Sequence, residues 1–162
     1  MSDIIDLLVD DHRAILELVT RLITDPRGAE VDKSFDRLYA CLKAHTFYEE
    51  TSVYPLLARK VECKELALHA YEHHRQANRL LDALRESDLK DASRKAKLMV
   101  LNEDLALHFK LEESSLLPLL GTSVSPEIMA SLGETYRGIR DKLQIKMTQM
   151  ALPEPSHLAP AT

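Results

Sequence analysis

The chain has 162 residues, of which 45% are hydrophobic and 29% are charged, so its length and composition suit a single globular domain with one core. A net charge of −5 with mixed basic and acidic residues excludes a nucleic-acid patch, and the sequence has neither a membrane span nor a secretory signal. Its two cysteines lack CxxC or zinc-ligand spacing, so we expect reduced thiols in a cytoplasmic protein.

Five helices are predicted, because glycine is scarce and good helix formers are abundant. Pro55 is expected to loosen the last turns of the second helix, and Gly121 to end the fourth. Ser125 and Pro126 form a helix start before the fifth. Residues 153–162 are expected to be a disordered tail. The predicted helices span about residues 3–24, 31–61, 64–86, 91–120 and 125–150.

Apolar residues recur at steps of three and four, which marks the buried face of a helix, but His and Glu interrupt the pattern. Short loops make successive helices antiparallel, so we predict an all-α, up-down-up-down four-helix bundle with an additional C-terminal helix. The bundle takes residues 1–122, and the helix at 125–150 packs on it or forms a homodimer contact. The interrupted faces read Ile5, Leu8, His12, Ile15, Val19, Leu22; Phe35, Leu38, Leu42, His45, Glu49, Val53, Leu56; and Leu98, Leu101, Leu105, His108, Glu112, Leu116, Leu119.

One phrase occurs twice. Residues 45–57 read HTFYEETSVYPLL and residues 108–120 read HFKLEESSLLPLL, at a constant offset of 63 residues. Each phrase places a His and a Glu four residues apart, on one helix face. Such side chains in a core need a partner that neutralises and coordinates them, which a divalent metal does. Imidazole with carboxylate suits iron, manganese or zinc, and two bridging carboxylates suit a pair of ions.

These motifs resemble the hemerythrin-like, or HHE cation-binding, domain family. The resemblance rests on DDH at 10–12, EHH at 72–74 and the two repeated phrases, and it covers about residues 3–120. It implies a non-haem centre of two iron ions inside a four-helix bundle, with the two Glu as bridges and the four His as terminal ligands. Carried over residue by residue, the implied ligands are His12, His45, Glu49, His74, His108 and Glu112.

The third helix leaves a choice between two adjacent histidines. The family pattern of following apolar residues favours His74, whereas the periodicity of the apolar face slightly favours His73. If His73 were the ligand, His69 one turn earlier could be a fifth histidine at the centre. Glu50 and Glu113 fall one residue off their faces, where they would support a ligand or carry a solvated charge. Asp11 is expected to be an exposed acid near His12.

Two iron ions offer up to about twelve coordination positions, and the implied ligands leave at least one exchangeable. Dioxygen, nitric oxide and peroxide are the small molecules expected there. The first hypothesis is a binding protein for oxygen or nitric oxide sensing, iron sensing, storage or transport. The second is a di-iron enzyme that disproportionates peroxide, reduces nitric oxide or oxidises ferrous iron. A third is a bundle with zinc or no metal. No nucleic-acid or membrane partner is expected.

Overall fold

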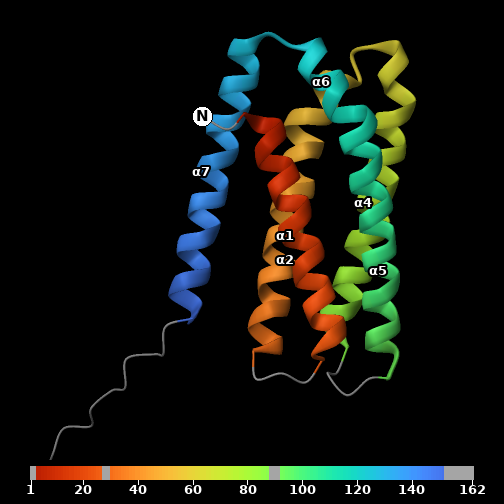
Figure 1. Cartoon of the computed structure of the whole chain (residues 1–162), viewed down its shortest axis with the longest axis vertical. Coiled ribbons are helices and arrows are strands. Elements are labelled where there is room, and N and C mark those ends of the chain that lie inside the picture. Colours follow the sequence, from red (N-terminus) through yellow and green to blue (C-terminus); the bar gives the residue numbers. More distant parts are fainter. Residues whose placement is uncertain (1–2, 27–29, 88–91, 152–162) are drawn as a thin grey trace, which may run out of the picture.

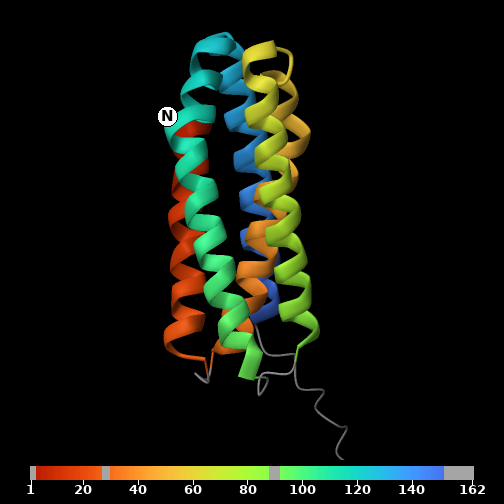
Figure 2. The same cartoon turned by 90° about the vertical axis from the view of Figure 1, so that its right-hand side faces the viewer.

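The computed structural model describes residues 3–26, 30–87 and 92–151, and the regular elements in these ranges are all helical. Helices α1, α2, α4 and α5 run alternately down and up beside one another, and α7 lies along one side (Figure 1, Figure 2). The predicted all-α four-helix bundle with an additional C-terminal helix is therefore confirmed. The elements are α1 (Ile4–Thr24), α2 (Val31–Tyr48), η1 (Glu49–Val53), α3 (Tyr54–Leu57), α4 (Val61–Glu86), α5 (Ala92–Leu111), η2 (Glu112–Leu116), α6 (Leu117–Ser123) and α7 (Pro126–Ala151).

A capping box fixes the start of α1. The Asp3 carboxylate accepts hydrogen bonds from the backbone N–H groups of Ile5 at 2.8 Å and Asp6 at 3.1 Å. The Asp6 side chain accepts in return from the Asp3 N–H at 3.4 Å, so two otherwise unpaired donors are satisfied. With the start fixed, the 3.6-residue period turns Leu8, His12 and Ile15 toward the bundle interior, where all three are buried.

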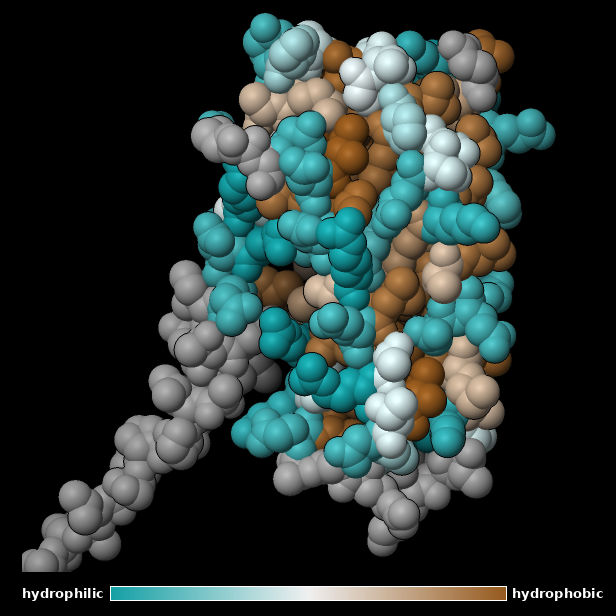
Figure 3. All heavy atoms as spheres, in the orientation of Figure 1, coloured by the Kyte–Doolittle hydropathy of each residue, from teal (hydrophilic) through white to brown (hydrophobic). Residues whose placement is uncertain are grey.

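The buried apolar side chains form two clusters rather than one continuous core. One cluster lies at the end of the bundle that holds α3 and α6, and the other lies toward the opposite end. Between them, each of the four bundle helices carries buried polar side chains instead of apolar ones. The layer is internal, because its histidines and glutamates are buried. The face of the molecule seen in Figure 3 is instead a mixture of hydrophilic and hydrophobic side chains.

Both repeated phrases form a π-helical segment, a helix with a wider turn. In η1 the Tyr54 N–H bonds to the Glu49 carbonyl five residues earlier, and in η2 the Leu117 N–H bonds to Glu112 in the same way. A proline follows each segment. Its ring clashes with the carbonyl four residues before it, which disfavours regular α-helical geometry there. The looser turn expected near Pro55 is thus a π-helical segment.

The π-helical segments correct two predicted core positions. The sequence pattern placed Leu56 and Leu119 on the buried faces, but both are only partly buried, and Leu57 and Leu120 are fully buried in their place. In an α-helix of 3.6 residues per turn, three steps of four residues would rotate a side chain about 120° off its face. The wider turn removes part of that rotation, so the residue twelve after each repeated His still points inward.

Two smaller expectations also change. Gly121 does not end its helix, because its backbone stays helical and α6 continues to Ser123. The C-terminal tail predicted for residues 153–162 lies outside the described residues.

Helix α7 packs along α1 and α2. The Tyr48 hydroxyl donates to the Leu132 carbonyl at 2.7 Å, and Tyr136 is buried against Tyr48 with ring centroids 4.6 Å apart. This face of α7 therefore covers the side of the bundle formed by the first two helices; a homodimer contact through α7 stays a prediction. In the part of the chain that the structure describes, no helix has the length and apolar character that crossing a membrane requires.

The register shift caused by the π-helical segments can be tested by truncating neighbouring leucines. Leu57→Ala is expected to lower the free energy of unfolding by about 2.7–5.0 kcal/mol, because it leaves a cavity in a fully buried site. Leu56→Ala should cost less, since that side chain is only partly buried. Urea denaturation followed by circular dichroism measures both. The opposite order would indicate an uninterrupted α-helix at this position.

Candidate metal centre

The polar layer of the bundle gathers six ionisable side chains from all four bundle helices and both π-helical segments. Each has at most 1% of its surface exposed, which is rare for such groups unless they are paired or coordinated. All six ligands implied by the family resemblance lie in this layer, whereas His73, the alternative on the third helix, does not. The six are His12 of α1, His45 of α2, Glu49 of η1, His74 of α4, His108 of α5 and Glu112 of η2.

These side chains form two overlapping groups, each able to hold one metal ion. In each group, the potential ligand atoms lie within 4.8 Å of one another. Glu49 and Glu112 belong to both groups, so the two potential metal positions share two carboxylates. Each group also has two histidines of its own. The groups are His12, His45, Glu49 and Glu112, and Glu49, His74, His108 and Glu112.

The closest approaches are between carboxylate oxygens and Nε2 atoms. Glu49 Oε2 lies 3.2 Å from Nε2 of His45 and 3.3 Å from that of His74. Glu112 Oε2 lies 3.2 Å from Nε2 of His12 and 3.4 Å from that of His108. Metal–ligand bonds of about 2.1 Å at octahedral or tetrahedral angles separate neighbouring ligand atoms by about 3.0–3.4 Å. The spacing therefore suits ligands of a common ion.

Several of the inward-facing atoms lack any hydrogen bond among the described residues. They are both carboxylate oxygens of Glu49, Oε2 of Glu112, and Nε2 of His12, His45 and His108. A buried acceptor or donor without a partner costs roughly 1–3 kcal/mol, so these atoms together mark a strained arrangement unless a cation binds them. The residues present thus fit a pair of divalent metal ions by burial, spacing and ligand type.

The buried imidazoles and carboxylates shift each other's pKa values. Burial alone would raise the pKa of Glu49, but His45 and His74 hold it well below its usual range. Burial would lower the pKa of His74, but the neighbouring carboxylates raise it to about 9, and they also raise the pKa of His12. For His108 burial prevails, and the pKa falls to about 4. A bound cation would displace the protons that otherwise balance these carboxylates.

The second glutamate of each repeated phrase holds a histidine of another helix. Glu50 Oε1 lies 3.0 Å from Nδ1 of His74, and Glu113 Oε1 lies 2.8 Å from Nδ1 of His12. A carboxylate at Nδ1 fixes the ring orientation and turns Nε2 toward the centre. Of the two roles considered for Glu50 and Glu113, the structure supports that of supporting a ligand. It also explains why both glutamates repeat.

His45 is held from α7, which sequence reasoning did not foresee. The Tyr136 hydroxyl lies 3.1 Å from Nδ1 of His45 and donates a hydrogen bond to the Asp11 carboxylate. Arg140 Nη2 pairs with the other oxygen of Asp11 at 3.2 Å. Asp11 is therefore not the exposed acid near His12 that the sequence predicted, because its side chain is 17% exposed and turned toward α7. The only signal in the sequence was the position of Tyr136 on the apolar face of α7.

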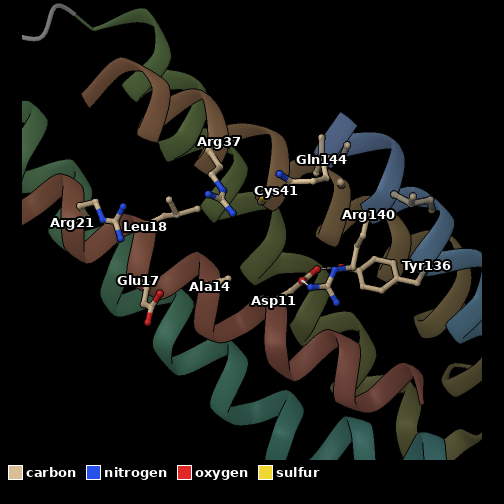
Figure 4. A pocket seen from close by; sticks show the side chains of 13 residues that line it. Asp11, Ala14, Glu17, Leu18, Arg21, Arg37, Cys41, Tyr136, Arg140 and Gln144 are labelled. Carbon is tan, nitrogen blue, oxygen red and sulfur yellow. Dashed lines mark hydrogen bonds and ion pairs between the residues drawn. The ribbon is translucent and has the colours of Figure 1, made fainter. Parts of the chain in front are cut away.

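Figure 4 shows Asp11, Tyr136 and Arg140 of this network at one end of a cavity between α1, α2 and α7. Arg140 and Tyr136 project from α7 toward Asp11, and Arg37 enters from α2. The cavity has a volume of about 180 Å³, and Cys41 also lines it. Burial raises the pKa of the Cys41 thiol, so the thiol keeps its proton. The cavity thus ends at residues that contact a candidate ligand without including the centre itself.

Tyr54 and Phe109 complete the surroundings of the centre. The Tyr54 hydroxyl donates to Glu112 Oε1 at 2.5 Å and lies 3.0 Å from Nε2 of His74. Burial and the two buried carboxylates raise the pKa of Tyr54, so it stays protonated as a hydrogen-bond donor. The Phe109 ring stacks on His12 with centroids 4.0 Å apart. One neighbour therefore supplies a donor and the other supplies an apolar wall.

Comparisons with known proteins identify the family and the fold of this chain. The model of the hemerythrin HHE cation-binding domain matches residues 3–120. Among solved structures, a hemerythrin HHE cation-binding domain-containing protein from Mycobacterium kansasii is similar with a TM-score of 0.69. It is 19% identical, and the match covers 92% of this chain and 90% of that one; at this identity the likeness shows the fold alone. The comparison with curated proteins finds no match.

The supporting carboxylates give a test that leaves the six candidate ligands intact. Glu50→Ala and Glu113→Ala are each expected to weaken divalent-metal affinity by about 10–100-fold, because His74 or His12 loses the group that orients its ring. Competition with a chromophoric chelator measures the affinity. Glu103→Ala, which removes an exposed carboxylate of α5, serves as the control. Unchanged affinity in both test variants would contradict the orienting role.

Proposed function

This chain belongs to the hemerythrin HHE cation-binding domain family, and from that premise we propose that its polar layer binds two iron ions at which a small molecule binds reversibly. The protein is a metal-binding, hemerythrin-like protein. The observation that supports a pair of ions is that two buried groups share Glu49 and Glu112. Shared carboxylates are suited to bridging two metals.

We assign the roles from the two groups. His12 and His45 would be terminal ligands of one iron ion, and His74 and His108 of the other. Glu49 and Glu112 would contact both ions and so carry most of the charge that neutralises them. Iron is preferred over zinc in this proposal, because only the redox-active ion supplies reversible binding of dioxygen, nitric oxide or peroxide at an open coordination position.

The surroundings favour binding over turnover. The six candidate ligands are almost completely buried between two apolar clusters, so only molecules of a few atoms can reach them. Burial raises the pKa values of Tyr54 and Tyr136, and both tyrosines therefore keep their protons. We therefore propose sensing, storage or transport of dioxygen or nitric oxide in the cytoplasm.

The proposed function is tested by metal analysis followed by exposure to small molecules. Protein purified without added metal is expected to contain two iron ions per chain. The reduced protein should give a stable optical change with dioxygen or nitric oxide. Glu49→Ala and Glu112→Ala should lose iron and this response together. Bound zinc, or no bound metal, would contradict the proposal, and sustained peroxide consumption that depends on both glutamates would favour an enzyme instead.

The two adjacent histidines of α4 give a separate prediction. His74→Ala is expected to lose iron from the centre, because His74 is fully buried beside Glu49. His73→Ala is expected to keep the same iron content at equilibrium, because His73 is half-buried and outside both groups. Iron quantitation after extended loading measures the difference. Full iron in His74→Ala with loss in His73→Ala would reverse the assignment.

A further inference from the structure

The face of α4 beyond the centre carries two histidines that the proposed iron pair does not use. His69 and His73 lie one helical turn apart, with ring centroids separated by 4.6 Å. His69 is exposed and His73 is half-buried. Two imidazoles at this spacing on a helix can chelate one divalent transition-metal ion. Their position at the surface means that an ion can reach them from solvent without any opening of the bundle.

These two rings are continuous with the buried centre. The His73 ring lies 5.5 Å from the His108 ring, and the His108 ring lies 4.6 Å from that of His74. A line of four imidazoles therefore runs from solvent to the second metal group. Metal ligands along such a line can exchange an ion stepwise, so that the ion never loses all of its protein donors.

A carboxylate of α5 lies beside this line. Asp104 is half-buried, and its charge acts on His73. It lies one helical turn before His108 on the same helix, which places both side chains on one face. Its Oδ2 accepts a hydrogen bond from Gln76 at 2.7 Å, which holds the carboxylate against α4. A negative charge at this point attracts cations toward the histidine pair.

His108 differs from the other three buried histidines in how it is held. Nδ1 of His12, His45 and His74 each contacts a carboxylate or a tyrosine hydroxyl. Nδ1 of His108 is buried and has no hydrogen-bond partner among the described residues. Because no such bond must break, its ring can reorient at lower cost than the others. The least constrained candidate ligand is therefore the one that faces the surface histidines.

We propose that His69 and His73, beside the negative charge of Asp104, form a capture site for a divalent transition-metal ion. From there the ion moves by way of His108 into the buried centre. The proposal rests on the proposed function, because it supplies the ions of that centre. Each step exchanges one ligand for another on an ion of constant charge, so no electron is transferred. At the centre, the cation takes the place of the protons that otherwise balance Glu49 and Glu112, and those protons leave to solvent.

The capture site is tested by the rate of metal uptake. Metal-free protein is mixed with Co²⁺, whose d–d absorption reports binding without a change of oxidation state. His69→Ala and His73→Ala are expected to slow uptake by at least about tenfold, the low end of the gain that local charge and donors give to association rates. Their final Co²⁺ content should equal that of the wild type. Arg79→Ala, at another exposed position of α4, is the control for His69→Ala and His73→Ala.

Asp104→Asn gives a matched test of the carboxylate, with Glu103→Gln as the control one residue away. Uptake should slow in Asp104→Asn, with a weaker salt dependence, and should be unchanged in Glu103→Gln. Equal rates in the wild type and all variants would overturn the proposal. Loss of final metal content in His73→Ala would also overturn it, because His73 would then be a ligand of the centre.

A second measurement tests metal binding at the capture site independently of metal binding at the buried centre. The metal-loaded protein is titrated with Zn²⁺ and is expected to bind one further ion more weakly, a site lost in His69→Ala and in His73→Ala. Absence of that site overturns the capture proposal. A wild type whose buried centre takes up no metal would contradict the proposed function, and the Zn²⁺ titration would still decide whether the surface histidines bind an ion.

Discussion

Two carboxylates buried among four imidazoles are the constraint on which the rest of this structure depends. Removing such groups from water costs several kcal/mol per charge, and their mutual attraction offsets that cost only with good geometry. Here Glu49 and Glu112 lie within 3.2–3.4 Å of imidazole nitrogens without forming hydrogen bonds to them. The protein side chains alone leave the layer unsatisfied, and bound cations would complete it. The chain belongs to a family of cation-binding domains.

The internal repeat explains how one short phrase builds most of the centre. Each copy supplies a histidine, a shared glutamate one turn later, and a second glutamate that orients a histidine of another helix. Each copy also contains the π-helical segment that keeps its histidine, its shared glutamate and a leucine twelve residues on facing inward. The second glutamate repeats because each copy must orient a histidine of another helix. The proline repeats because it favours the π-helical segment that precedes it.

The sequence was sufficient for the fold and for five of the six residues that meet in the layer, because apolar periodicity interrupted by His and Glu reports which faces are buried. The sixth, His74, came from the family resemblance. Periodicity assumes 3.6 residues per turn, so it cannot show which residues face inward after a π-helical segment. It therefore places Leu56 in the core, whereas the structure buries Leu57. Periodicity slightly favoured His73 over His74, because Ala77, Leu80 and Leu84 fit the face of either residue, and only packing shows that His74 is the buried one.

The sequence could not predict contacts between helices that are far apart along the chain. These contacts hold the histidines of the two metal groups to different degrees. Tyr136 lies outside the residues that match the family model, yet it contacts His45 and links it to Asp11 and Arg140. On the opposite side, no described residue holds His108 in this way. In the group covered by α7, Tyr136 holds the His45 ring in place. In the other group, the His108 ring is not held at Nδ1 and can move. An ion bound beside His108 would therefore exchange more readily than one bound beside His45, whose ring α7 holds in place.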